Sequence, residues 1–327
     1  TGKAVTFARP GTYLTDDIVI GAGERLDICG ASWLTTKPVI KLNDNVDLNL
    51  FQANGAGAEL ILEDLTLDQN RDNQTTGHAI RSGGCAMVSV KRCKIQNCRN
   101  YGFGAQAGTT QAMRFVEVEF DNIGRDCIDV KDFDFANGLF YARDIKATNW
   151  SLDHTTNAII DIRGPADVRG VYGIASNDCH GVRFRGGNVQ GRAGFGVIGD
   201  AIIEGDGVST VIGAHMASDN GGAIFENIHG KDVSAAFLQS AEGRGGVVKG
   251  VTAENTHGDG LSIQGEDLVI TGANLACASS ASRCFDIEPN AVRPQIIGLN
   301  AVNMNTAETI VGRIQAGASD VLISGVL

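Results

Sequence analysis

The sequence predicts an all-β protein that folds as a single-stranded right-handed parallel β-helix, in which the chain winds through stacked coils. Apolar and polar residues alternate in short runs rich in Val, Ile and Phe, and no stretch keeps the roughly 3.6-residue period of a helix. The runs recur in units of about 20 to 30 residues, the length of one solenoid coil. Glycine supplies 43 of the 327 residues, which suits coil corners that need a positive φ and little side-chain volume.

Two short phrases alternate along the chain. In the first, a turn residue leads into alternating apolar positions, at residues 100–105, 125–130, 156–162, 180–184, 220–225, 259–263 and 283–287. The second is an alternating run that closes on a small or polar residue, at residues 60–67, 87–95, 115–120, 247–253 and 296–302. It usually ends in an asparagine: Asn70, Asn97, Asn122, Asn149, Asn177, Asn220 and Asn255. Stacked asparagines would hydrogen-bond between coils and satisfy the turn backbone.

The two ends of the solenoid are expected to differ. Residues 1–38 are predicted to form its N-terminal opening segment and cap, and residues 39–327 its coils, as one domain. Sheet edges invite aggregation unless they are covered. Residues 318–327 are still strand-like, so we expect the last coil to be covered by something outside this chain or by a partner subunit.

Charge and composition exclude several functions. The chain carries 27 Lys and Arg against 38 Asp and Glu, a formal net charge of −11, whereas nucleic-acid and anionic-membrane binders need a basic face. No apolar run approaches about 18 residues, so no membrane insertion is expected. The eight cysteines and six histidines show no zinc-ligand spacing. The cysteines are expected to be buried free thiols, with a pairing of Cys93 with Cys98 or of Cys277 with Cys284 as the alternative in an oxidising compartment.

Stacking the first phrase coil upon coil defines which side chains face outward. Alternate apolar residues such as Ile128 and Val130 point inward, and the residues between them point outward. On three successive coils the outward pairs are Asp129 with Lys131, Asp161 with Arg163, and Arg183 with Arg185. Asp126, Asp153 and His154 lie in the turns beside them. Carboxylates and basic groups gathered in this way predict a place where a sugar chain binds and is cleaved.

Two mechanisms use the carboxylates of adjacent coils. Asp129 and Asp161 would lie about 5 Å apart at the backbone, near the ~5 Å of a retaining glycosidase, and a wider splay would reach the spacing of an inverting one. Alternatively, the two carboxylates hold Ca²⁺ against a uronate carboxylate. Lys131, Arg163 or Arg183 is then the base of a β-elimination.

A third mechanism uses His154 as acid or base, positioned by Asp153 or Asp161. The alternative without chemistry is a solvated ladder of salt bridges, which contributes little to stability. The predicted catalytic residues are Asp126, Asp129, Asp161, Arg163, Arg183 and His154. The predicted substrate-binding residues are Lys131, Arg185 and Trp150. No metal ligand is predicted apart from the Ca²⁺ alternative.

Several segments resemble the pectate-lyase-like β-helix superfamily, which includes polysaccharide lyases, family 28 glycoside hydrolases and phage tailspike depolymerases. The opening, with Gly11-Thr-Tyr-Leu-Thr and Gly21-Ala-Gly-Glu-Arg-Leu-Asp-Ile-Cys-Gly, is similar to the first segment of tailspikes and related lyases. Leu65-Thr-Leu-Asp-Gln-Asn resembles their next coil. The likeness at the level of the fold covers nearly the whole chain.

Two local stretches carry a sharper likeness. Gly124-Arg-Asp-Cys-Ile-Asp-Val-Lys resembles the Gly-Asp-Asp-Cys phrase of polygalacturonase-like hydrolases, with Arg125 in place of the first Asp. Trp150-Ser-Leu-Asp-His, followed by Asn157-Ala-Ile-Ile-Asp-Ile-Arg, resembles the calcium-binding stretch of pectate lyases. The position of Asn157 is usually acidic in that family.

The resemblance implies a polysaccharide depolymerase of the phage tailspike type, which cleaves a surface or capsular glycan by hydrolysis or β-elimination. The basic residues beside the carboxylates favour an acidic glycan. No cofactor is expected, with Ca²⁺ as the exception if the enzyme is a lyase. The tailspike likeness further implies a homotrimer that is extracellular or associated with the virion tail. Two alternatives stay open: a non-catalytic, adhesin-like glycan-binding solenoid, and a uronate epimerase.

Overall fold

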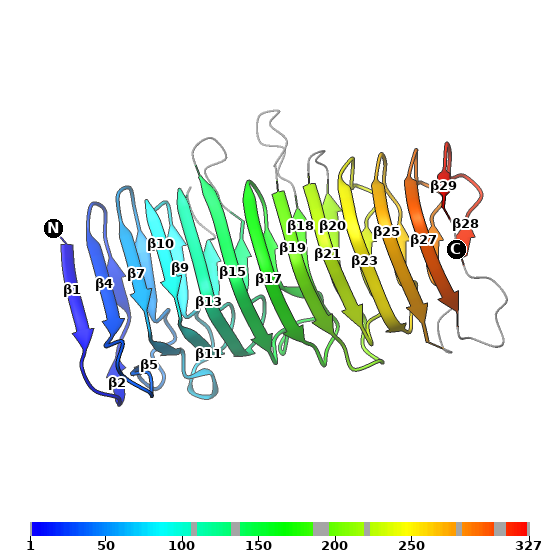
Figure 1. The fold of residues 1–327 in the computed structure, drawn as a ribbon. Coiled ribbons are helices and arrows are strands. Elements are labelled where there is room, and N and C mark those ends of the chain that lie inside the picture. The colour runs from blue at the N-terminus through cyan, green and yellow to red at the C-terminus, as the bar shows by residue number, and fades with distance from the viewer. Residues whose placement is uncertain are drawn as a thin grey trace. The chain divides into compact units, whose positions relative to one another are not determined.

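The computed structural model describes residues 2–105, 110–131, 138–185, 196–218, 223–278, 283–303 and 312–325. Within these residues the chain is almost entirely β-strand, with one short 3-10 helix, η1 (Arg71–Asn73). The strands pair in parallel and wind as a solenoid, which confirms the predicted right-handed parallel β-helix (Figure 1). The chain forms two compact units, Thr1–Ile162 and Arg163–Leu327.

The first unit consists of a narrow sheet of short strands and a wide sheet. The narrow sheet contains β3 (Ile18–Ile20), β6 (Phe51–Asn54), β9 (Ile80–Gly83), β12 (Phe103–Ala105), β14 (Ile128–Val130) and β16 (Asn157–Ile162). The wide sheet contains β1 (Gly2–Phe7), β2 (Thr12–Thr15), β4 (Arg25–Gly30), β5 (Val39–Leu42), β7 (Glu59–Glu63), β8 (Thr66–Asp68), β10 (Met87–Lys91), β11 (Lys94–Cys98), β13 (Ala112–Ile123) and β15 (Leu139–Thr148).

The second unit repeats this plan with longer strands in its wide sheet. That sheet contains β17 (Ala166–Ile174), β19 (Gly196–Glu204), β21 (Ala223–Lys231), β23 (Val247–Thr256), β25 (Val269–Cys277), β27 (Gln295–Asn303) and β29 (Leu322–Ser324). The narrow sheet contains β18 (Cys179–Arg185), β20 (Val211–Ser218), β22 (Ala235–Gln239), β24 (Leu261–Ile263), β26 (Phe285–Ile287) and β28 (Gly312–Ile314).

The opening segment takes part in this pattern. Strand β1 pairs in register with β4, β2 with β5, and β3 with β6. Residues 2–38 therefore form a coil that continues directly into the rest of the first unit. At the other end, β29 pairs with β27.

The core of each coil is filled by residues that alternate inward along the strands. In the narrow sheet of the first unit, Ile128 lies opposite Phe103 on one side and Ile160 on the other, and all three are fully buried. The ring of Phe103 packs against Phe115 of the wide sheet, with the ring centroids 4.9 Å apart. The inward positions predicted from the alternation are thus confirmed for these strands. The cysteines are free, and all except Cys29 are buried.

The corners explain part of the glycine excess. One corner of the wide sheet is formed by residues with positive φ, and in the second unit these are mostly glycine: Gly170, Asp200, Asn227, Gly250, Gly272, Gly298 and Gly325. In the first unit the same corner is occupied by Asp64, Arg92, Glu117 and Asp144.

The asparagines that close the second phrase occupy another corner. Asn70, Asn97, Asn122 and Asn149 all have positive φ, and the Asn122 amide donates to the side-chain oxygen of Asn97 at 2.8 Å. Asn220 lies outside the described residues.

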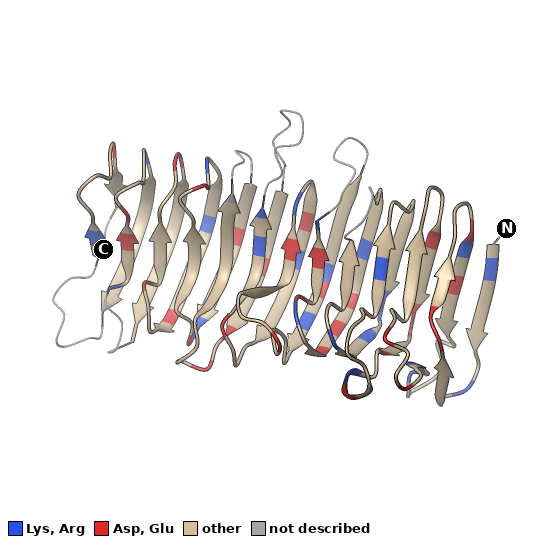
Figure 2. Ribbon diagram, turned by 180° about the vertical axis from the view of Figure 1, so that it is seen from behind, with Lys and Arg blue, Asp and Glu red and all other residues tan. Residues whose placement is uncertain are grey.

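Charged residues of both signs are distributed along the strands (Figure 2). Among the described residues, no helix has the length and apolarity that a membrane crossing requires.

Candidate active site on the narrow sheet

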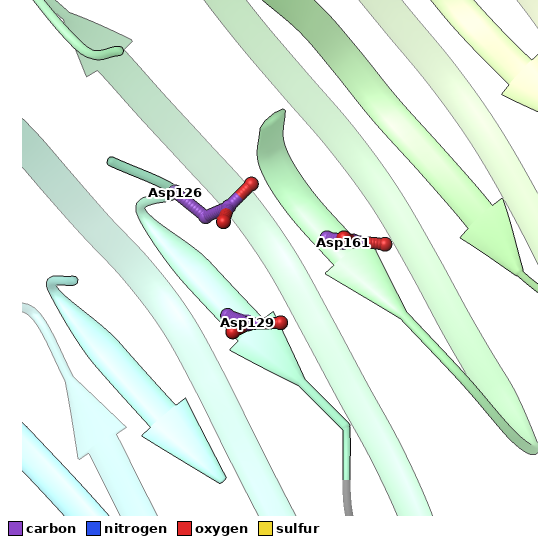
Figure 3. A group of neighbouring side chains, drawn as sticks. All are labelled: Asp126, Asp129 and Asp161. Atoms are coloured by element: carbon purple, nitrogen blue, oxygen red, sulfur yellow. The ribbon is translucent and has the colours of Figure 1, made fainter. Parts of the chain in front are cut away.

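Three buried carboxylates meet on the narrow sheet of the first unit (Figure 3). Asp126 lies in the turn before β14, Asp129 in the middle of β14, and Asp161 directly opposite Asp129 on β16. One oxygen from each carboxylate lies within 4.8 Å of the other two. The three residues are only 3%, 0% and 3% exposed, in that order. The predicted juxtaposition of Asp129 with Asp161 is therefore present.

Local sequence explains why these side chains converge. Because Ile128 and Val130 point into the core, Asp129 must point to the outer face of the sheet. The same alternation directs Asp161 to that face. Asp126 is fixed differently, since its Oδ1 accepts a hydrogen bond from the backbone N–H of Ala158 at 2.6 Å. This bond ties the turn of one coil to the strand of the next.

Lys131 supplies positive charge at the edge of the cluster. Its Nζ lies 2.9 Å from Asp129 Oδ2, and its side chain is 39% exposed while that of Asp129 is fully buried. Burial by itself lowers the pKa of Lys131, but the Asp129 carboxylate and the Tyr101 hydroxyl outweigh it, so the pKa is raised overall. Lys131 is therefore a charged counter-ion for Asp129 and is the member of the group that reaches solvent.

Tyr101 and Arg125 also belong to this group, although neither was predicted as a site residue. The Arg125 Nη1 donates to Tyr101 Oη at 3.4 Å, and Lys131 Nζ lies 5.4 Å from the centroid of the Tyr101 ring. Tyr101 is 7% exposed. One sequence feature could have identified Tyr101 as a site residue. It lies in the phrase at residues 100–105, one coil before the phrase at 125–130.

A gap in the row of outward side chains lies beside Asp129. In register along the narrow sheet, Arg81 lies opposite Gly104, and Gly104 lies opposite Asp129. Because Gly104 has no side chain, the row is interrupted between a guanidinium and a carboxylate. Of the nearby basic residues, Lys131 contacts Asp129 directly, whereas Arg125 contacts Tyr101 and Arg81 lies two strands from Asp129.

His78 is buried and packs against Tyr101. The two rings lie with centroids 4.9 Å apart, and His78 Nδ1 accepts the backbone N–H of Tyr101 at 3.3 Å. Burial, reinforced by the positive charges of Arg81, Arg125 and Lys131, lowers the pKa of His78 to about 4. The imidazole is therefore neutral at neutral pH, as its acceptor role requires.

This histidine predicts loss of stability in mild acid. Its pKa is about 4 in the folded chain and 6.5 when unperturbed, so the unfolded chain binds more protons between these values and stability falls as the pH drops through them. The difference corresponds to ~3 kcal/mol. His180 of the second unit, whose pKa is also lowered by burial, acts in the same direction. We therefore expect the free energy of unfolding, measured by urea titration, to fall between about pH 6.5 and 4.

The variant His78→Asn isolates the contribution of His78, because an amide oxygen can accept the Tyr101 N–H without binding a proton. Its unfolding free energy should fall less steeply over the same pH range than that of the wild type. His154→Asn, at an exposed turn position, is the matched control and should keep the wild-type slope. Equal slopes for His78→Asn and the wild type would contradict this account.

Among the residues near the turn at 150–154, burial speaks against the role predicted for Trp150, while the role predicted for His154 stays a prediction. Trp150 is 1% exposed, so its ring lies in the core and cannot stack on a sugar, which corrects that prediction. Asp153 forms ion pairs with Arg71 at 2.7 Å and Arg99 at 3.7 Å, which hold the turn. His154 is exposed, and its backbone carbonyl accepts from the Asn157 amide at 3.1 Å.

The other predicted basic residues belong to the second unit. Arg183 is buried on β18 opposite His215 of β20, and the rings of His180 and His215 stack with centroids 4.9 Å apart. Arg185 lies at the end of the same strand, and Arg163 is the first residue of the unit. The catalytic and substrate-binding roles predicted for these three arginines stay predictions.

The donor set also fits a hard divalent cation. Ca²⁺ takes oxygen ligands at about 2.3–2.6 Å, so oxygens that lie within 4.8 Å of one another can share one ion. Asp126, Asp129 and Asp161 would hold it. Such an ion would supply positive charge to bind the carboxylate of an acidic sugar.

Comparison with known proteins identifies the fold. No family model matches the chain, and no curated protein matches it in sequence. The A-module of the Azotobacter vinelandii mannuronan C-5 epimerase AlgE4 is similar in structure, with a TM-score of 0.61 and 16% identity over 99% of this chain and 91% of that one. For the AlgE6 A-module of the same organism the TM-score is 0.50, with 14% identity over 100% and 90% of the chains.

A phage protein shows the same likeness. The pre-mature gene product 12 of bacteriophage phi29 aligns with a TM-score of 0.51 and 11% identity, over 97% of this chain and 52% of that chain. This chain thus spans about half of the phage protein. At these identities the matches show a shared right-handed β-helix fold. The function has to be argued from the residues of the site.

Proposed function

We propose that the protein is an enzyme that cleaves a glycosidic bond in an acidic surface or capsular polysaccharide by hydrolysis. The observation that carries this proposal is that one carboxylate oxygen from each of Asp126, Asp129 and Asp161 lies within 4.8 Å of the other two, beside the ammonium group of Lys131. Glycoside hydrolysis needs two carboxyl groups in different protonation states across the scissile bond. The ion pair between Lys131 and Asp129 favours the ionised form of that carboxylate, and unequal surroundings of this kind separate the protonation states of neighbouring acids.

The contacts suggest a role for each acid. Asp129 carries the Lys131 ammonium as its counter-ion, so we assign it the ionised role of nucleophile or base. Asp161, opposite on the neighbouring strand, is assigned the proton donor to the glycosidic oxygen. Asp126, fixed by the N–H of Ala158, holds the shape of the cluster. The close spacing is nearer to the ~5 Å of retaining enzymes than to the ~6.5–9.5 Å of inverting ones.

The charges around the cluster favour an acidic substrate. Arg81, Arg125 and Lys131 all act on His78 as neighbouring positive charges, in a chain whose formal net charge is −11. A neutral glycan would not need a group of cations at this place. Lys131, whose side chain is 39% exposed, is suited to meet the carboxylate of a uronate residue.

A second candidate is β-elimination or C-5 epimerisation of a uronate. The observation that favours it is the Tyr101 hydroxyl, which contacts Arg125 and lies beside Lys131. Both reactions begin when a base removes the proton next to the uronate carboxylate, and nearby cations stabilise the charge that develops. The two epimerase modules that share the fold are consistent with this candidate. Ca²⁺ at the three aspartates would support the same chemistry.

Mass spectrometry of the products separates these reactions. The protein is incubated with polygalacturonate, alginate and an acidic bacterial capsule polysaccharide, with dextran as the neutral control. Hydrolysis adds one water for every bond cut and creates new reducing ends. Elimination cuts without adding water and leaves an ultraviolet-absorbing unsaturated uronate, whereas epimerisation changes neither mass nor chain length.

We expect new reducing ends with added water, from an acidic polymer, and a rate that survives EDTA. Unsaturated products without added water would replace hydrolysis by elimination, and activity lost with EDTA and restored by Ca²⁺ would show that the three aspartates work with a bound ion. Binding without any change in the polymer would favour the alternative that the protein is a non-catalytic, adhesin-like glycan-binding solenoid. The homotrimer and the extracellular or virion-associated location stay proposals that rest on the tailspike likeness.

A further inference from the structure

A groove lies on the outer face of the wide sheet in the first unit. Its volume is about 440 Å³, and its lining comes from β10, β13 and β15. In register across these strands, Met87 lies opposite Ala112 and Ala112 opposite Leu139. These three residues form an apolar strip. The groove thus belongs to a different sheet from Asp129 and Asp161.

Two guanidinium groups flank the one tyrosine of this groove. Arg114 lies directly opposite Tyr141 in register, with its Cζ 5.5 Å from the ring centroid. The Cζ of Arg143 lies 4.9 Å from the same centroid, and its Nε donates to Tyr141 Oη at 3.0 Å. Attraction between a cation and the face of an aromatic ring holds such groups in place. Tyr141 therefore orders positive charge along one side of the apolar strip.

Arg114 and Arg25 lie on the same sheet, but only the charge of Arg25 is neutralised by acidic side chains that the structure describes. Arg25 forms ion pairs with Asp27 at 3.0 Å and Glu59 at 3.1 Å. Arg114 is exposed, and no acidic side chain of the described residues forms a salt bridge with it. Its guanidinium is therefore available to an anion from solution.

The pairing of an apolar strip with an available guanidinium matches the chemistry of a uronate sugar. A pyranose ring has an apolar face of C–H groups, which suits the exposed Leu139 (51% exposed) and, on the other side of Ala112, Met87. Its carboxylate can accept two parallel N–H bonds from one arginine. A neutral sugar would leave the guanidinium unused, and a small inorganic anion would leave the apolar strip uncovered.

We propose that this groove is a second polysaccharide-binding site, which takes uronate residues of an acidic glycan strand through Arg114, Tyr141 and the Met87–Leu139 strip. The site performs no chemistry. It retains a polymer on the wide sheet while the narrow sheet is free to act on the same or another strand. The inference does not depend on which reaction the carboxylates catalyse, because it rests on residues outside that cluster.

Electrophoresis in native gels that contain a polysaccharide tests the groove directly. All proteins carry Asp129→Asn, so that the polymer in the gel is not degraded. The probes are polygalacturonate and alginate, with dextran as the neutral control. We expect both uronate polymers to retard the parent protein and dextran to leave its mobility unchanged. Arg114→Gln and Tyr141→Ala should each raise the apparent dissociation constant by about five- to tenfold.

Arg25→Gln is the matched control, since it removes an arginine of the same sheet whose charge is already neutralised. It should bind as the parent does. Circular dichroism checks that every variant keeps its β-structure, and Arg114→Lys separates charge from geometry by restoring part of the binding. The proposal is overturned if Arg114→Gln and Tyr141→Ala migrate like the parent, or if dextran retards the protein equally. It is also overturned if neither uronate polymer retards the parent.

Discussion

Replacing Asp129 with asparagine is expected to lower the rate of product release by about 10³-fold while the fold is retained. Asparagine has nearly the same shape as aspartate, so the buried position on β14 stays filled. The substitution removes the charge that faces Lys131 at 2.9 Å and the carboxylate that acts as nucleophile or base. The loss should appear in kcat, because the missing interaction develops during the reaction.

Two controls accompany this variant. Asp267→Asn removes an exposed carboxylate of the second unit, which pairs with Arg293 at the surface, and should keep the wild-type rate. Thermal melting followed by circular dichroism should show that Asp129→Asn is still folded. If Asp129→Asn is folded and releases product at the wild-type rate, the assignment of the catalytic site is wrong.

Replacing Gly124 with alanine is expected to destabilise the first unit by at least about 3 kcal/mol. Gly124 directly precedes the turn that holds Asp126, and its N–H donates to the carbonyl of Cys98 at 2.9 Å. An added Cβ would penetrate the backbone carbonyl of Arg99 and would lie 2.6 Å from Asp153 Oδ2. Neither group can retreat easily, because one is backbone and the other is held by Arg71 and Arg99.

Gly21→Ala is the matched control in the same unit. The nearest group to a Cβ at that position is the flexible carboxylate of Glu24, at 3.4 Å, so we expect little change. The free energy of unfolding from urea titration gives the comparison. Equal stabilities for Gly124→Ala and Gly21→Ala would show that the coils at this corner are not packed as closely as described.

The fold class was predictable because one physical rule operates in every coil. Side chains alternate across a strand, so the pattern Ile128-Asp129-Val130 already fixes which residue faces outward. Repetition of this pattern in Ile160-Asp161-Ile162 then places the two acids on neighbouring strands, as the structure confirms. Local alternation and coil length together were sufficient for this part of the site.

The rest of the site depends on turns, where no such rule applies. Tyr101 and His78 come from the segments before β12 and β9, and their contact depends on the path of two turns. Trp150 follows Asn149, whose positive φ redirects the chain, and its ring lies in the core. The sequence pattern does not show in which direction such a residue points.

Corner composition was predictable only in part. Glycine and asparagine accept positive φ readily, but Arg92 and Glu117 adopt it as well. At these positions the stacking of neighbouring coils determines the backbone, and residue type alone gives no signal. The groove at Arg114 and Tyr141 was likewise not predictable from residue type. The register that places these two residues side by side depends on the length of the coil between them.

The most direct measurement of the central claim compares product release by Asp126→Asn, Asp129→Asn, Asp161→Asn and the triple variant on an acidic polymer that the wild type cleaves. If the three carboxylates act as one catalytic unit, each single change removes most of the activity and the triple variant is hardly slower than the slowest single one. Wild-type rates in the folded single variants, or no cleavage of any acidic polymer by the wild type, would contradict the account.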